Sequence, residues 1–127
     1  MLTPLALFVN RNIQKVQADA TISETARLMR DRRGGSLFIE KGGEYVGIVS
    51  ESDLVHLAIA DERNPEKTAV REIMRRPIIS VDIDQSAKAA NDLMHKRGTR
   101  HLAVKEAGKI VGVLSVRDLL NCFKNRP

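Results

Sequence analysis

The chain has 127 residues, 43% hydrophobic and 29% charged, which is ordinary for one soluble globular domain. Its formal net charge of +5 favours anionic partners, either nucleic acid or small anions such as nucleotides. No apolar run approaches the roughly 18 residues of a membrane-spanning helix. A single cysteine, Cys122, excludes an internal disulfide and suits a reducing compartment, so we expect a cytoplasmic protein.

The hydrophobic pattern predicts the same series of elements twice. The first series is a short helix at 5–9, a strand at 13–16, a helix that starts at the capping box of Thr21 and Glu24, strands at 36–40 and 45–50, and a helix at 51–61. The polar stretch 62–67 is expected to be a linker. The second series is a short helix at 68–75, a strand at 78–81, a helix at 86–97, strands at 100–105 and 109–115, and a helix at 116–124.

The two halves are also related residue by residue. Under an offset of 65 positions, which carries Gly47 to Gly112, twelve residues between 16 and 54 have an identical counterpart without any gap. Chance would give about 2 such matches at ordinary composition. We therefore predict two structural repeats. Because one repeat alone would bury too little surface, we expect the two repeats to share one core.

A short phrase stands at the end of the last strand of each repeat. Gly47 is followed by Ser50 three positions later and by Asp53 three positions after that. The second copy consists of Gly112, Ser115 and Asp118. A glycine inside a strand lets another backbone or a ligand come close. A Ser or Asp at a helix entrance either caps free amides or faces a polar ligand, and both interpretations stay open.

Two copies of this phrase in register resemble the CBS domain, named after cystathionine beta-synthase, whose phrase is Gly, apolar, any residue, Ser or Thr, two of any kind, Asp. The resemblance covers about residues 5–124. It implies an α/β (α+β) fold of two tandem β-α-β-β-α repeats related by a pseudo-twofold axis. Repeat 1 is then 1–61, the linker 62–67 and repeat 2 68–127.

The resemblance also implies ligand-binding residues. In CBS pairs, adenine nucleotides or other adenosyl compounds often bind in two clefts between the repeats. The family's Asp holds ribose hydroxyls there, and its Ser or Thr lies near ribose or phosphate. These roles fall on Asp53 with Ser50 and on Asp118 with Ser115. Helix capping is the alternative role for all four residues.

Basic and apolar residues complete the predicted site. Arg100, just before the middle strand of repeat 2, takes the position that holds phosphate in this family, and Arg117 precedes Asp118. Their counterparts in repeat 1 are Gly35 and Ser52, so the two clefts are not equivalent. Because the phosphate-binding residue often reaches across from the other repeat in this family, Arg100 is expected to act together with either Asp53 or Asp118, and the sequence leaves that choice open. Arg100 and Arg117 are otherwise solvated surface arginines. The apolar walls for the base are expected from strand residues, namely Ile13 and Ile78.

We interpret the chain as a non-catalytic regulatory module that binds AMP, ADP or ATP and acts on an unknown effector protein in trans. No cofactor is required, no catalytic constellation is visible, and His56, His95 and His101 lack the spacing of a metal site. The alternative is a nucleic-acid binder that uses the basic surface, but aromatic interleaving is missing. The cluster of Arg71, Arg75 and Arg76 is interpreted as a solvated face.

A homodimer is also expected, because CBS pairs commonly associate through the helices that follow the sheets. Both helices have more apolar residues than one buried face needs. These residues are Leu54, Val55, Leu57, Ala58, Ile59, Leu119, Leu120 and Phe123.

Overall fold

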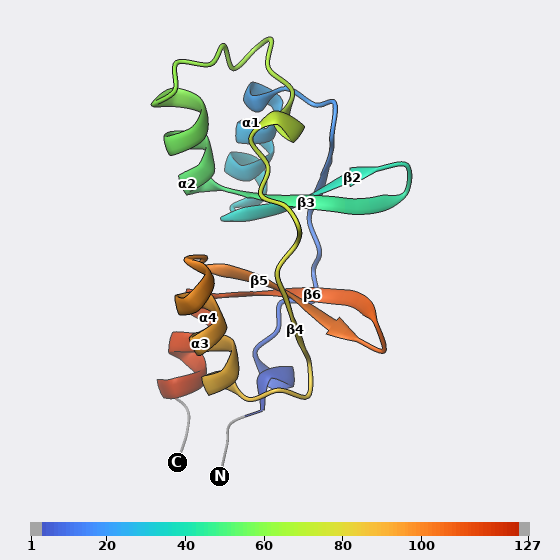
Figure 1. Ribbon diagram of the computed structural model, residues 1–127, viewed down its shortest axis with the longest axis vertical. Coiled ribbons are helices and arrows are strands. Elements are labelled where there is room, and N and C mark those ends of the chain that lie inside the picture. The colour runs from blue at the N-terminus through green and yellow to red at the C-terminus, as the bar shows by residue number, and fades with distance from the viewer. Residues whose placement is uncertain (1–3, 125–127) are drawn as a thin grey trace. The chain divides into compact units, whose positions relative to one another are not determined.

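The computed structural model describes residues 4–124, which form two compact units with one three-stranded sheet each (Figure 1). The first-sheet unit, Gln14–Ile78, contains β1 (Lys15–Gln17), α1 (Ile22–Arg32), β2 (Ser36–Lys41), β3 (Glu44–Ser50), α2 (Glu51–Asp53), the π-helix η2 (Leu54–Ile59) and the 3-10 helix η3 (Val70–Glu72). The second-sheet unit, residues 4–13 and 79–124, contains the 3-10 helix η1 (Leu5–Leu7), β4 (Ser80–Asp82), α3 (Ala87–Arg97), β5 (His101–Glu106), β6 (Lys109–Ser115) and α4 (Val116–Lys124). The predicted α/β class with two β-α-β-β-α repeats is confirmed, and the pseudo-twofold axis stays a prediction.

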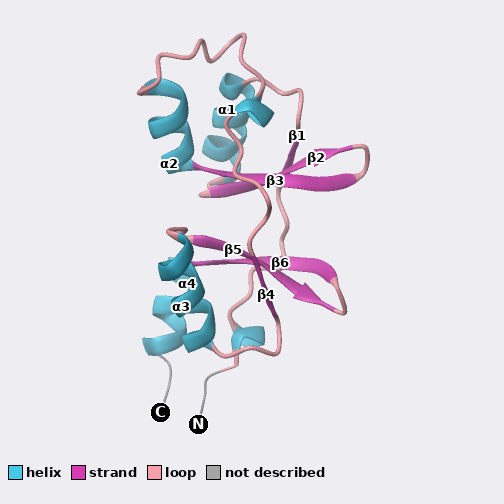
Figure 2. Ribbon diagram, viewed as in Figure 1, coloured by secondary structure: helices cyan, strands magenta, loops and turns pink. Residues whose placement is uncertain are grey.

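The two sheets have the same topology. In each, the middle strand pairs parallel with the short first strand and antiparallel with the last one. The antiparallel register shifts after Ile39 in one sheet and after Val104 in the other, which is the same place under the 65-residue offset. Within each unit the longer helices lie on one face of the sheet (Figure 2). The units are therefore two copies of one structure, down to the extra residue that the register shift leaves in the last strand, Val46 in β3 and Val111 in β6.

Side-chain caps start the two long helices where the sequence predicts them. The Thr21 hydroxyl accepts a hydrogen bond from the Glu24 amide at 3.1 Å, and the Ser86 hydroxyl accepts one from the Ala89 amide at 3.1 Å. Each bond satisfies an amide that has no partner within its own helix. Both predicted helix starts are confirmed.

The helix after the first sheet differs from the predicted regular helix at 51–61. It is α-helical only over Glu51–Asp53 and then widens into the π-helix η2, in which the Ala60 amide donates to the Val55 carbonyl at 2.9 Å. Its counterpart α4 is α-helical over Val116–Lys124. A π-helix places one extra residue in each turn, so the later side chains rotate around the helix axis, and a hydrophobic pattern does not reveal this change.

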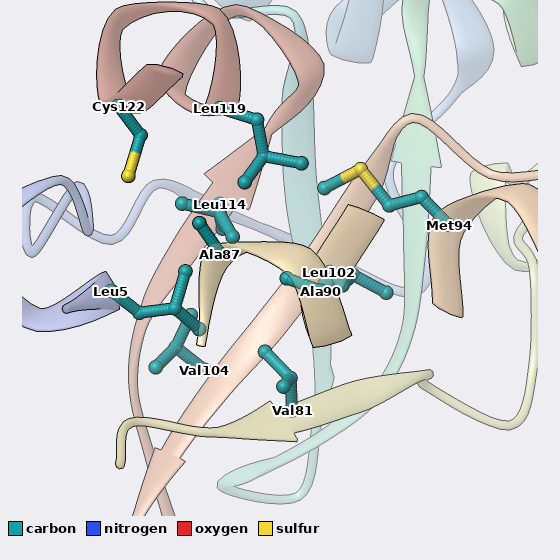
Figure 3. Packing of buried hydrophobic residues seen from close by; sticks show 10 residues of the cluster. All are labelled: Leu5, Val81, Ala87, Ala90, Met94, Leu102, Val104, Leu114, Leu119 and Cys122. Carbon is teal, nitrogen blue, oxygen red and sulfur yellow. The ribbon is translucent and has the colours of Figure 1, made fainter. Parts of the chain in front are cut away.

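Buried hydrophobic residues form two clusters, one in each unit. The expectation that the two repeats share one core stays a prediction. In the second-sheet unit, the cluster joins side chains from β5, β6, α3 and α4 with Leu5 of η1 (Figure 3). In the first-sheet unit, Val70 of η3 is the corresponding residue and is also fully buried. Each short 3-10 helix therefore contributes a core residue to its sheet.

Each last strand is bridged by a segment that is distant in the sequence. Asn10 and Val113 exchange two backbone hydrogen bonds of 3.0 Å, and Arg75 and Ile48 exchange bonds of 2.9 and 3.1 Å. The first of these bridges joins residues 4–13 to the second sheet, and the other joins residues 68–78 to the first sheet. The compact units consequently divide the chain after Ile13 and after Ile78, whereas the sequence repeats were divided at the 62–67 linker.

The glycine of each motif lies under its bridging segment. A Cβ atom on Gly112 would come within 2.5 Å of Val9 Cγ1 and 2.6 Å of the Asn10 carbonyl oxygen. A Cβ atom on Gly47 would meet the Met74 sulfur at 2.6 Å and the Arg75 carbonyl oxygen at 3.0 Å. Of the two roles that the sequence left open for these glycines, the approach of another backbone is the one observed.

We expect Gly112→Ala to lower the free energy of unfolding by about 1–3 kcal/mol, because the added methyl group overlaps backbone atoms that hydrogen bonds hold in place. Gly47→Ala should cost less, since the Met74 side chain can move away. Urea unfolding of both variants and the parent measures the two losses. Parent-like stability of Gly112→Ala would contradict the close approach.

Candidate functional site

The Ser and Asp of both motifs form hydrogen-bonded caps at a helix start. The Ser50 hydroxyl accepts from the Asp53 amide at 3.3 Å, and Asp53 Oδ2 accepts from the Ser50 amide at 2.9 Å. In the second copy the Asp118 amide donates to the Ser115 hydroxyl at 3.2 Å, and the Ser115 amide donates to Asp118 Oδ2 at 2.8 Å. Capping is thus a real role of all four residues. In both copies the cap uses Oδ2 of the aspartate and makes no bond to Oδ1.

In the first-sheet unit, Oδ1 of Asp53 has a charged partner. It accepts a hydrogen bond from Arg75 Nε at 2.7 Å in an ion pair. The Asp53 side chain is 1% exposed, whereas the Arg75 side chain is 49% exposed. Both oxygens of this carboxylate are therefore hydrogen-bonded within the unit, and neither is accessible to solvent.

In the second-sheet unit, Oδ1 of Asp118 has no hydrogen-bond partner among residues 4–124. The Ser115 hydroxyl donates its bond of 3.0 Å to Oδ2, the oxygen that the cap already uses. Asp118 is half-buried, unlike the fully buried Asp53. The two carboxylates thus occupy the same place in their repeats but differ in accessibility.

Two basic residues lie at the first turn of α4. The Val116 amide donates to the Arg100 carbonyl at 3.0 Å, and Arg117 is the second residue of α4. Both side chains are exposed, and neither forms an ion pair within the part of the chain that the structure describes. In the first-sheet unit, Glu51 makes the equivalent amide bond to Gly35 at 3.0 Å, so no arginine stands at that position.

The predicted apolar walls are divided between the units. Ile13 is half-buried and belongs to the unit that contains Asp118, and Ile78 is half-buried and belongs to the unit that contains Asp53. Whether either side chain contacts a ligand stays a prediction, as do the clefts themselves.

Sequence reasoning missed the role of Arg75. The cluster of Arg71, Arg75 and Arg76 was interpreted as a solvated face, but Arg71 forms an ion pair with Asp19, and Arg75 forms one with the buried Asp53. No local pattern marks Arg75 as the partner of Asp53, because the two residues are 22 positions apart in the sequence.

Comparison with known proteins decides the family. The model of the CBS domain matches twice, at residues 6–60 and 70–125. The chain belongs to the CBS domain family. Proteins with CBS domains are regulatory and signal-transduction modules.

Individual CBS proteins agree with this assignment. An uncharacterized protein of Methanopyrus kandleri is 35% identical over 79% of the chain, which spans 52% of that protein. A Burkholderia ambifaria protein with CBS domains, whose description names signal transduction, superimposes with a TM-score of 0.91 at 28% identity and covers 98% of this chain and 97% of its own. A hexameric CBS-CP12 protein from bloom-forming cyanobacteria superimposes with a TM-score of 0.88 at 25% identity, covering 100% of this chain and 77% of its own.

Two further findings concern other kinds of site. Within residues 4–124, no group of three His, Cys, Asp or Glu side chains is arranged to hold a metal ion, and no helix is long and apolar enough to cross a membrane. Cys122 is buried in the second-sheet core, and burial raises the pKa of its thiol. A thiol with a raised pKa is a poor nucleophile at neutral pH.

We expect Asp53→Asn to lower the free energy of unfolding by about 2–3 kcal/mol, because the amide keeps one oxygen for the cap but turns its NH2 group toward the Arg75 guanidinium. Asp118→Asn should cost no more than about 1 kcal/mol, since the cap is its only partner within the unit. Urea unfolding at neutral pH measures both.

Arg75→Gln provides the control for this comparison. In the Asp53→Asn background, Arg75→Gln should lower the free energy of unfolding little further, because the ion pair is already lost. A double-mutant cycle gives the interaction free energy of the ion pair. Equal losses for Asp53→Asn and Asp118→Asn would contradict the difference between the two carboxylates.

Proposed function

We propose that this CBS pair is a non-catalytic sensor that binds an adenosine nucleotide, AMP, ADP or ATP, at the Ser115–Asp118 motif and signals to a partner protein in trans. One observation carries the proposal. A half-buried carboxylate with an unpartnered Oδ1 lies at the same helix start as two exposed arginines that form no ion pair among residues 4–124. A ribose and a phosphate require this combination of groups.

The chemistry of each group suits one part of a nucleotide. The open oxygen of Asp118 can accept hydrogen bonds from a vicinal diol such as the 2′ and 3′ hydroxyls of ribose. The guanidinium groups of Arg100 and Arg117 can donate paired hydrogen bonds to phosphate oxygens. The start of α4 adds the positive end of a helix dipole, which favours an anion. Ile13, in the same unit, is the proposed apolar wall for the base.

Nucleic-acid binding has less support than the nucleotide proposal. Two of the three arginines in the predicted basic cluster, Arg71 and Arg75, are paired with aspartates and contribute little net charge there. Nucleic-acid binding relies on several unpaired Lys or Arg side chains on one face of the protein, which neutralise backbone phosphates. A short RNA therefore serves as the comparison ligand in the test.

We expect calorimetry at physiological salt to show AMP binding to the parent protein and no binding of a short RNA of random sequence. Arg100→Ala should weaken AMP about 10- to 100-fold, because a charge-assisted hydrogen bond contributes roughly 1.5–3 kcal/mol. The same variant should change adenosine binding little, since adenosine has no phosphate.

Arg97→Ala is the matched control, because it removes an exposed guanidinium from α3 in the same unit. It should leave both affinities unchanged. AMP binding by Arg100→Ala as tight as that of the parent would make Arg100 an ordinary surface residue and remove it from the site. Tight RNA binding without AMP binding would favour the alternative function.

We also propose that the sensor works as a homodimer that uses the helices after the sheets. Several predicted interface residues are in the cores: Ala58 and Leu119 are buried, and Leu54, Leu57 and Phe123 pack against the core clusters. Three remain exposed, Val55 by 56%, Ile59 by 62% and Leu120 by 58%. Val55 and Leu120 are equivalent under the 65-residue offset, so both repeats present an apolar side chain at the same helical position.

We expect light scattering at tens of micromolar to give twice the mass of the chain. Val55→Glu combined with Leu120→Glu should give the monomer mass, because a charged side chain in an apolar contact lacks a partner. Leu7→Glu, which alters an exposed leucine of η1, is the control and should leave the mass unchanged. A monomeric parent protein would contradict the proposal.

A further inference from the structure

We propose that the residue at the equivalent positions 75 and 10 decides which copy of the motif binds a ligand. Arg75 closes the Asp53 copy by serving as an internal partner of its carboxylate, and Asn10 leaves the Asp118 copy open. The inference rests on the proposed nucleotide function and adds that each chain has one binding site rather than two.

Backbone pairing makes positions 75 and 10 equivalent. Arg75 pairs with Ile48 one residue after Gly47, and Asn10 pairs with Val113 one residue after Gly112. In both units the paired residues exchange two backbone hydrogen bonds of 2.9–3.1 Å. Because each glycine allows this close approach, the Cα atoms of residues 75 and 10 have the same relation to their motifs.

Arg75 removes Asp53 from the surface of its unit. Its Nε donates to Oδ1 at 2.7 Å while the cap uses Oδ2, so each oxygen has a donor. The carboxylate is 1% exposed, and the guanidinium side chain is about half exposed. A diol that approached Asp53 would have to displace a charged donor from a buried anion, which is the costly way to break such a pair.

Asn10 leaves Asp118 accessible. Its side-chain Oδ1 accepts a hydrogen bond from the Asn12 amide at 3.0 Å, within its own turn. The side chain is uncharged, so it cannot form an ion pair with Asp118. An asparagine is also shorter than an arginine by several bonds. With no cation from position 10, the open oxygen of Asp118 is left for a ligand.

The residues around each motif agree with this division. The closed copy has Glu51 and Gly35 where the open copy has Val116 and Arg100. The guanidinium of Arg75 is already paired with Asp53, so it is not available to a phosphate. One residue thus removes both the ribose acceptor and a potential phosphate donor from the first-sheet unit.

Exchange of the two residues tests the inference in the full chain, with AMP as the ligand and calorimetry as the measurement. The parent should bind one AMP per chain. Arg75→Asn should add a second site that binds AMP more weakly than the first, because Gly35 and Ser52 stand there in place of Arg100 and Arg117. The added site should disappear in the double variant with Asp53→Asn. Asn10→Arg should weaken the parent site at least 10-fold, because the new guanidinium can pair with Asp118.

Two control variants separate charge from size. Asn10→Gln lengthens the side chain without charge and should keep AMP binding, and Arg75→Lys keeps a cation beside Asp53 and should keep one site. Asn10→Arg is independent of Arg75→Asn, so it tests the inference even if Arg75→Asn does not fold.

The outcomes distinguish the two proposals. Two sites per chain in the parent, or unchanged AMP affinity in Asn10→Arg, would overturn the role of positions 75 and 10 while the nucleotide function stands. Absence of AMP, ADP and ATP binding in every variant would overturn the nucleotide function and this inference with it.

Discussion

In each unit, a strand and a segment from the other half of the sequence lie so close at one glycine that a methyl group does not fit between them. This close approach allows the paired backbone hydrogen bonds from Asn10 to Val113 and from Arg75 to Ile48. It also brings the buried residues Leu5 and Val70 to their cores. The positions of Asn10 and Arg75 beside the two motifs depend on this steric condition.

The cap formed by Ser115 and Asp118 is compatible with the binding role that we propose for the same residues. The cap needs one hydroxyl and one carboxylate oxygen, and it holds the aspartate in one rotamer against the helix start. The second oxygen is then fixed in place without being used. A binding group that is pre-organised in this way loses little conformational entropy when a ligand arrives.

The two repeats have the same fold, but the aspartates of their motifs have different environments. The units share sheet topology, bulge position and helix caps, yet Asp53 forms an ion pair with Arg75, whereas Asp118 forms none among residues 4–124. One substitution at an equivalent position is sufficient for this difference, because a buried carboxylate requires a partner and a half-buried one can use water. Duplication thus supplies the scaffold, and local charge decides which copy is available.

The sequence by itself determined the repeat, which is visible as identities at a fixed offset, and also the helix cap at Thr21 and the Gly–Ser–Asp motif, which depend on residues a few positions apart. It did not reveal the π-helix η2 or the pairing of Arg75 with Asp53. Arg75 and Asp53 are far apart in the chain, and only tertiary packing, through the close approach at Gly47, brings a surface arginine against a buried carboxylate. The family and the two motifs were therefore readable from local pattern, whereas the difference between the motifs was decided by long-range contacts.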